Sequence, residues 1–135
     1  MSGERYPVLW IGQVSVVTLP AEIDVTNADA TRDELLAVLS QGATLLVANM
    51  SKTVFCDSSG VSALVRVFRH AATSATALRL VVTTPAVLRV LSITGVDRLV
   101  DVYPSVAASL AGPNGQADQA CPDGAAAKAD TDGGA

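Results

Sequence analysis

The chain has 135 residues, of which 50% are hydrophobic and 16% are charged, a composition that predicts one globular domain with a buried core and excludes a wholly disordered chain. Its formal net charge of −4 leaves no basic surplus, which argues against nucleic acid and anionic membrane surfaces as partners. No apolar run approaches the roughly 18 residues of a membrane-spanning helix, and no secretory leader is visible at the N-terminus, so we expect a cytoplasmic protein.

Two strands and a helix are predicted in the first part of the chain. Residues 8–11 and 13–19 are apolar runs on either side of a glycine, which indicates a hairpin or a bent edge strand. A helix is expected to begin at Thr26 as its cap, with Asp29 in a capping-box position, and to end at Gly42.

A buried strand, a polar turn and a second helix follow. Residues 44–50 (TLLVANM) form a short apolar run, as a central strand would. The turn at 57–60 (DSSG) then leads into a segment with apolar residues at helical spacing, namely Val61, Leu64, Val65 and Phe68. The opposite face of this helix carries Ser62, Arg66 and Arg69, which are candidates for binding a partner, although such a face is often only solvated.

The remaining elements continue the alternation of strands and helices. Residues 78–82 predict a strand, and a helix over 85–93 is opened by Thr84-Pro85 and stopped by Gly95. Residues 99–103 and 104–111 predict a last short strand and a terminal helix.

The order of elements predicts an α/β fold with right-handed crossovers. We expect a largely parallel central sheet of four to five strands, with edge strands at the N-terminus and at least four helices, over residues 1–112. Residues 113–135 contain no Leu, Ile, Val or aromatic residue, which predicts a disordered Ala/Gly/Asp-rich tail. This tail is acidic, because it holds four aspartates and one lysine.

Neither cysteine indicates a disulfide framework or a metal site. Cys56 and Cys121 belong to no C-x-x-C pair, and a single histidine makes a tetrahedral zinc site difficult to complete. Cys56 is expected to be a small buried hydrophobe, with a redox role at the turn as speculation. No G-x-x-x-x-G-K-[ST] sequence is present, so we predict no ATP-binding loop and no cofactor.

The polar turn between the central strand and the second helix has two readings. Asp57, Ser58 and Ser59 are all residues that cap helices, with Ser59 as the expected cap and Asp57 ordering the turn. Alternatively, a hydroxyl at this turn is there to be modified, because loops present such groups to partners. Gly60 allows a tight turn or a close approach, and unpaired N–H groups at the helix start would favour an anion.

Three segments together resemble the STAS family, specifically the bacterial anti-sigma-factor antagonists. Asp57-Ser58-Ser59-Gly60 looks like the phosphorylation motif of that family, between a strand and an amphipathic helix. Ala21-Glu22-Ile23-Asp24 is similar to its Gly-Glu-Leu-Asp turn, with alanine in place of the glycine, and residues 85–91 are similar to its third-helix segment. The resemblance spans about residues 8–112.

The resemblance implies a regulatory protein and no enzyme. Ser58 would accept phosphate from a partner serine kinase that is itself the anti-sigma factor, and Asp24 would lie near Ser58, unless it is only a turn acid. The unmodified protein would bind the kinase and release a sigma factor, phosphorylation would end the binding, and a PP2C-type phosphatase would be a further partner.

Other functions compete with this interpretation. A STAS module can serve as a small-molecule sensor or a signalling scaffold without phosphorylation, and a transporter-linked domain is disfavoured because the chain holds no membrane segment. A hydrolase with Ser58, His70 and Asp24 as its catalytic triad is also disfavoured. The sequence has no G-x-S-x-G elbow, and His70 lies three helical turns from Ser58.

Overall fold

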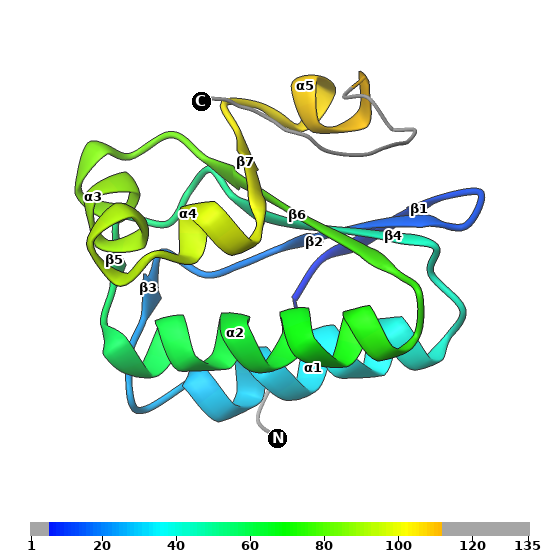
Figure 1. Cartoon of the computed structure of the whole chain (residues 1–135), viewed down its shortest axis with the longest axis horizontal. Helices are drawn as coiled ribbons and strands as arrows, with labels where there is room; N and C mark the ends of the chain where they lie inside the picture. The colour runs from blue at the N-terminus through cyan, green and yellow to red at the C-terminus, as the bar shows by residue number, and fades with distance from the viewer. Residues whose placement is uncertain (1–5, 112–135) are drawn as a thin grey trace.

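The structure is a computed structural model that describes residues 6–111, so the predicted tail and Cys121 lie outside the described residues. A five-stranded sheet forms its centre, with the strands in the order β1-β2-β4-β6-β7 (Figure 1). These strands are β1 (Val8–Ile11), β2 (Val14–Thr18), β4 (Leu45–Met50), β6 (Ala77–Val82) and β7 (Asp101–Tyr103). The helices are α1 (Ala28–Ser40), α2 (Ser58–Thr73), α3 (Pro85–Thr94), α4 (Val96–Leu99) and α5 (Val106–Ala111).

The sheet is parallel except for its first strand. β1 pairs with β2 in an antiparallel hairpin around Gly12, whose φ is 63°. β2, β4, β6 and β7 then pair in parallel. The predicted α/β class, the mostly parallel sheet and the N-terminal edge strand are confirmed.

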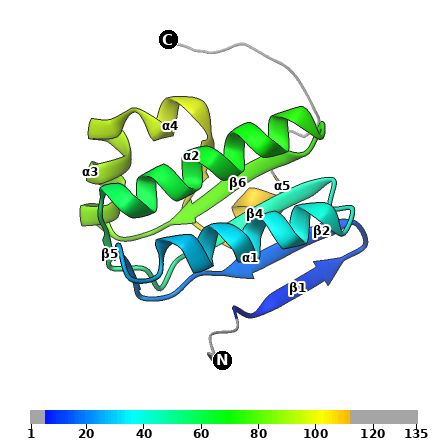
Figure 2. The ribbon, with the colours of Figure 1, turned by 90° about the horizontal axis from the view of Figure 1, so that it is seen from below.

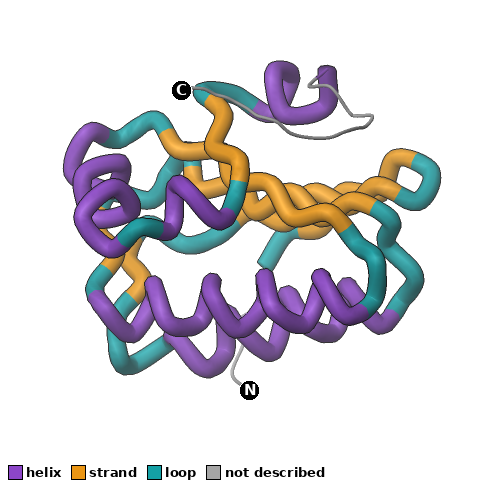
Figure 3. Tube along the Cα trace, viewed as in Figure 1, coloured by secondary structure: helices purple, strands orange, loops and turns teal. Residues whose placement is uncertain are grey.

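The helices lie on both faces of the sheet and at one end of it. α1 and α2 pack side by side on one face, whereas α5 lies on the other, as Figures 1 and 3 show. α3 and α4 lie beside the carboxyl ends of the strands (Figure 2). The core lies between the sheet and the α1–α2 layer, and its largest fully buried side chains include Leu19, Ile23, Leu35, Leu46, Met50, Leu64 and Leu80.

Local predictions about helix ends had mixed outcomes. Gly95 ends α3 in the left-handed conformation, with φ of 85°, as predicted. The cap of α1 was wrong, because Asn27 precedes the helix and the side chain of Thr26 bonds Asp24 instead. The terminal helix begins at Val106 and not at Pro104.

A second, two-stranded sheet was not predicted. It pairs β3 (Glu22–Ile23) with β5 (Phe55–Cys56) in parallel. Two-residue strands are too short to show a period in the sequence. This small sheet joins the turn after β2 to the turn that precedes α2.

Candidate functional site

The polar turn is held by the small β3–β5 sheet. Ile23 and Cys56 are partners in its register, and the N–H of Asp57 donates to the carbonyl of Ile23 at 3.1 Å. Two turns that are far apart in the sequence, at Asp24 and at Asp57, therefore lie next to each other at one end of the main sheet.

Asp57 is the N-cap of α2. Its Oδ1 accepts hydrogen bonds from the N–H groups of Ser59 at 2.9 Å and Gly60 at 3.1 Å. The prediction that Ser59 is the cap was wrong, since Ser59 lies within the first turn of the helix. The expectation of unpaired N–H groups here needs the same correction, because the Asp57 carboxylate already occupies two of them and complements the helix dipole.

Ser58 is the first residue of α2 and is exposed to solvent. Its hydroxyl makes no hydrogen bond to any residue from 6 to 111. Because Asp57 caps the helix, the Ser58 hydroxyl is not needed to hold the turn in place. A hydroxyl in this position is accessible to the active site of another protein without any movement of the domain.

Gly60 allows the first turn of α2 to pack tightly on the small sheet. A Cβ added at Gly60 would lie 2.6 Å from the Sγ of Cys56 and 2.8 Å from the Cγ2 of Ile23. Any larger residue would push the polar turn at residues 57–60 away from the small sheet or displace those two side chains.

Cys56 is a packing residue below the turn. Its side chain is buried, as predicted. Desolvation, followed by the neighbouring charge of Asp57, raises the pKa of the thiol to about 11. Because the thiolate is the reactive form, a thiol with this pKa is a poor redox sensor near neutral pH, which weighs against the speculated redox role.

Asp24 serves its own turn. Its Oδ1 accepts hydrogen bonds from the Thr26 hydroxyl and, at 2.9 Å, from the backbone N–H of Thr26, and these bonds lower the pKa of the Asp24 carboxyl. The side chain of Asn27 bridges the same turn, accepting from the Asp24 N–H and donating to the Glu22 carbonyl. Asp24 forms no hydrogen bond with Ser58 within the described part of the chain.

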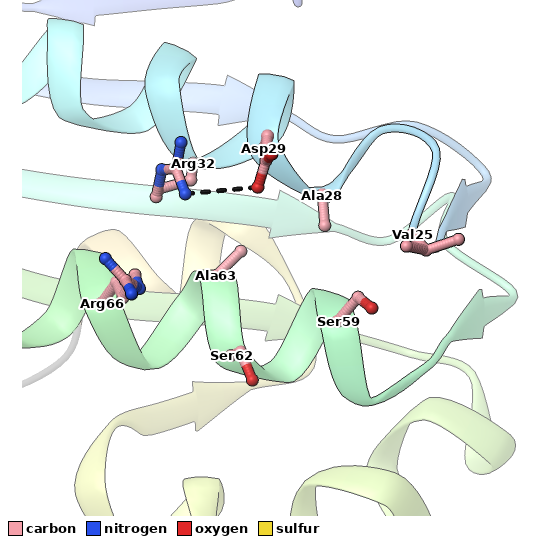
Figure 4. A pocket seen from close by; sticks show the side chains of 8 residues that line it. All are labelled: Val25, Ala28, Asp29, Arg32, Ser59, Ser62, Ala63 and Arg66. Carbon is pink, nitrogen blue, oxygen red and sulfur yellow. Dashed lines mark hydrogen bonds and ion pairs between the residues drawn. The ribbon is translucent and has the colours of Figure 1, made fainter.

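A shallow groove runs between α1 and α2 next to the polar turn at residues 57–60 (Figure 4). Its volume is about 280 Å³, and its lining residues are Val25, Ala28, Asp29, Arg32, Ser59, Ser62, Ala63 and Arg66. A second hollow of about 570 Å³ shares Arg32 and Arg66 and extends to Arg69 and His70. Sequence reasoning missed this groove, because it depends on the packing of two helices.

The basic side chains of the groove differ in their pairing. Arg32 forms ion pairs with Asp29 at 3.2 Å and Asp33 at 3.1 Å. Arg66 and Arg69 are exposed and form no ion pair with residues 6–111. Ser62 is also exposed on α2, so all three predicted partner-binding residues are accessible.

The hydrolase interpretation fails on geometry. His70 lies in the last turn of α2 and Ser58 in its first turn. A separation of twelve residues along one helix is about 18 Å, far beyond a hydrogen bond. Among the described residues, no group of three potential metal ligands is found either.

The site is thus an exposed hydroxyl at a strand-to-helix turn of an α/β domain, which makes no hydrogen bond to residues 6–111 and has two unpaired arginines farther along the same helix. The chain belongs to the STAS domain family, whose profile matches residues 8–109.

Similar solved structures agree with this assignment. An anti-sigma factor antagonist from Mycobacterium paratuberculosis is 27% identical, with a TM-score of 0.73 over 79% of this chain and 91% of that chain. The Bacillus protein SpoIIAA is 21% identical in its unphosphorylated form and 20% in its phosphorylated form, with TM-scores of 0.67 and 0.61. These two structures cover 78% and 79% of this chain, and 93% and 97% of theirs.

The same fold occurs inside a transporter. The murine anion transporter Slc26a9 is 22% identical, with a TM-score of 0.64, and the match covers 75% of this chain but only 18% of that one. In residues 6–111 no helix is long and apolar enough to cross a membrane. No match was found among curated protein sequences.

Proposed function

We propose that this protein is an anti-sigma factor antagonist whose Ser58 accepts phosphate from an anti-sigma factor that is a serine kinase. The observation that carries the proposal is the exposed Ser58 hydroxyl, which makes no hydrogen bond to the described residues and lies in the first turn of α2. The likeness to the mycobacterial antagonist over most of both chains supports the same role.

The charge around Ser58 explains how phosphate would act as a switch. A phosphoryl group adds about −1.5 to −2 charges at neutral pH. The Asp57 carboxylate already holds the N–H groups of Ser59 and Gly60, so the new charge would be added next to an existing one. Arg66 follows Ser58 by eight residues, about 12 Å along the helix, so it cannot neutralise the phosphate by a direct contact.

The added negative charge, next to the Asp57 carboxylate and beyond direct contact with Arg66, would therefore remain on the surface. A partner that packs closely against unmodified Ser58 would have to desolvate this charge or oppose it, which disfavours binding by several kcal/mol. Phosphorylation would release the partner without unfolding the domain.

The surface next to Ser58 is suited to a protein partner. Val25, Val54 and Phe55 are exposed by 75%, 55% and 49%, although each is apolar. Val25 lies in the turn after β3, Val54 immediately precedes β5 and Phe55 is the first residue of β5. Arg66 and Arg69 extend the surface along α2. We propose that the kinase contacts this apolar rim together with acidic side chains that pair with the two arginines.

In this role the protein is a substrate and a competitor, and the nucleotide, magnesium and general base belong to the kinase. Its unmodified form would displace a sigma factor in the cytoplasm, and a PP2C-type phosphatase would restore that form. The likeness to Slc26a9 reflects the fold, and we assign no transport role from it.

Phosphotransfer provides the test. The protein is incubated with ATP and each candidate anti-sigma kinase from the same genome, and phosphate is located by mass spectrometry. We expect phosphate on Ser58 and none on Ser58→Ala, whereas the matched variant Ser59→Ala keeps its phosphate. Phosphate on Ser59 or Ser62 in the unaltered protein would refute the assignment of Ser58, and no transfer from any of these kinases would refute the proposed role.

A further inference from the structure

The open edge of β1 is unusual in composition. β1 is the last strand on its side of the sheet, as Figure 2 shows, and no described strand pairs with its outer side. All four of its side chains are apolar and exposed, Val8 by 37%, Leu9 by 58%, Trp10 by 38% and Ile11 by 48%. The other edge, β7, is shorter, begins with the charged Asp101 and is followed by Pro104, and both residues discourage pairing.

The hydrogen-bond pattern shows which backbone groups of β1 are free. The N–H of Thr18 donates to the carbonyl of Pro7 at 2.9 Å, so Pro7 and Thr18 form a hydrogen-bonded pair of the β1–β2 ladder. Because such pairs alternate along an antiparallel ladder, Leu9 and Ile11 also direct their N–H and C=O groups to β2. Val8 and Trp10 direct theirs to the open edge.

These free groups complement a second copy of the same strand. In an antiparallel pair with its two-fold axis at Leu9, Val8 of one copy would lie opposite Trp10 of the other, and each such pair exchanges two hydrogen bonds. All four outward donors and acceptors of each strand are then used. A two-fold axis at Trp10 would instead place Val8 opposite Gly12, which lies in the hairpin turn.

Charge also favours an identical partner. Residues 7–21 contain no charged side chain, so no like charges would face each other along this edge. A charged foreign segment would find no counter-charge on β1. We infer that β1 is a self-association edge, through which two copies of this chain join their sheets in an antiparallel pair centred on Leu9.

The size of the contact sets its strength. The exposed surface of these four apolar side chains limits the buried area to at most about 700 Å² for two copies, which is below the ~1,200 Å² of a standard stable interface. The dimer is therefore expected to be reversible and to form at high protein concentration. The acceptor turn lies near the carboxyl ends of β2 and β4, so this edge is a separate surface and the inference does not depend on the proposed function.

Cysteine cross-linking tests the register in the full-length chain with Cys121 replaced by serine. Opposed residues of a non-hydrogen-bonded pair have Cα atoms about 4.5 Å apart, a distance that a disulfide can bridge. Leu9→Cys should therefore form a disulfide-linked dimer under mild oxidation. The neighbouring variant Trp10→Cys should stay monomeric, because Trp10 lies opposite Val8 and not opposite itself.

A concentration series provides the second measurement. In sedimentation equilibrium, the mass of the unaltered protein should rise above the 13.8 kDa of the monomer as concentration increases. Trp10→Lys, which places a charge on the edge, should abolish the rise, and the matched variant Ile93→Lys should retain it. A constant monomer mass would overturn the inference, and so would equal cross-linking of both cysteine variants or a dimer that Trp10→Lys leaves intact.

Discussion

The contact between Gly60 and the small sheet predicts a large effect for a single methyl group. In Gly60→Ala the new Cβ would lie 2.6 Å from the Cys56 Sγ and 2.8 Å from the Ile23 Cγ2. Neither neighbour has an unhindered direction in which to move, because Cys56 and Ile23 are both buried. The acceptor turn therefore has to shift, or the core around it has to rearrange.

The magnitude follows from two opposing effects. Overpacking of a dense core typically costs about 1–3 kcal/mol, and replacing glycine by alanine in a helix gains at most about 1 kcal/mol. Two contacts below 3.0 Å place the cost in the upper half of that range, about 2–3 kcal/mol. After the helix gain we expect Gly60→Ala to lower the free energy of unfolding by about 1–2 kcal/mol, which corresponds to a decrease in Tm of roughly 4–10 °C for a domain of this size.

Urea denaturation followed by far-ultraviolet circular dichroism measures this effect, and a double-mutant cycle assigns its cause. Cys56→Ala removes the sulfur that the new methyl would meet, so the double variant should be less destabilised than the sum of the single variants by about 1 kcal/mol. Gly42→Ala is the matched control. Its Cβ would meet nothing within 4 Å, and its cost arises from a φ of 96°, so it should be additive with Cys56→Ala.

Two outcomes would refute the packing argument. One is a Gly60→Ala variant as stable as the unaltered protein. The other is additivity of Gly60→Ala with Cys56→Ala, which would show that the sulfur is not the group that opposes the methyl.

Further predictions concern the groups around the acceptor. Asp57→Ala should destabilise the protein by about 1 kcal/mol, because two N–H groups of α2 lose their acceptor, while Asp57→Asn should recover most of this loss in the same urea titration. The lowered pKa of the Asp24 carboxyl stabilises the folded protein above pH 3.8, the ordinary pKa of the group, and this stability is lost as the pH falls through the folded-state pKa. Asp24→Asn should therefore lose less stability in acid than the unaltered protein. An acid profile identical to that of the unaltered protein would contradict the lowered pKa. Cys56, with its pKa raised to about 11, should react with iodoacetamide at pH 8 far more slowly in the folded protein than in protein unfolded by urea. Mass spectrometry of the Cys121→Ser variant would measure both rates, and equal rates would contradict the burial of Cys56.

The sequence predicted the main sheet well because its strands carry continuous apolar runs. The segment TLLVANM became β4, and the Thr84-Pro85 and Gly95 signals delimited α3 correctly. Each of these signals is local, since it depends on the conformations that proline and glycine favour or on the burial of one short strand.

Signals that depend on distant residues were missed or misread. The sequence offers three adjacent capping residues at 57–59, and the choice among them is made by the β3–β5 pairing, which fixes Asp57 against the Ile23 carbonyl. At α1, Thr26 is drawn away from the capping role by Asp24. The groove between α1 and α2 likewise requires knowledge of how the two helices pack. The candidate acceptor, in contrast, was found through its motif, and the structure adds that its hydroxyl is exposed and makes no hydrogen bond to the described residues.

The proposed switch depends on whether a charge on Ser58 decides the binding of the kinase. Isothermal titration calorimetry with the anti-sigma kinase that phosphorylates Ser58 would compare the unmodified protein, the protein phosphorylated on Ser58, and Ser58→Ala. We predict similar affinities for the unmodified protein and Ser58→Ala, and an affinity at least about tenfold lower for the phosphorylated form, since like charges across an interface cost more than the 1.4 kcal/mol that this factor represents. Equal affinities for the phosphorylated and unmodified forms would contradict the switch.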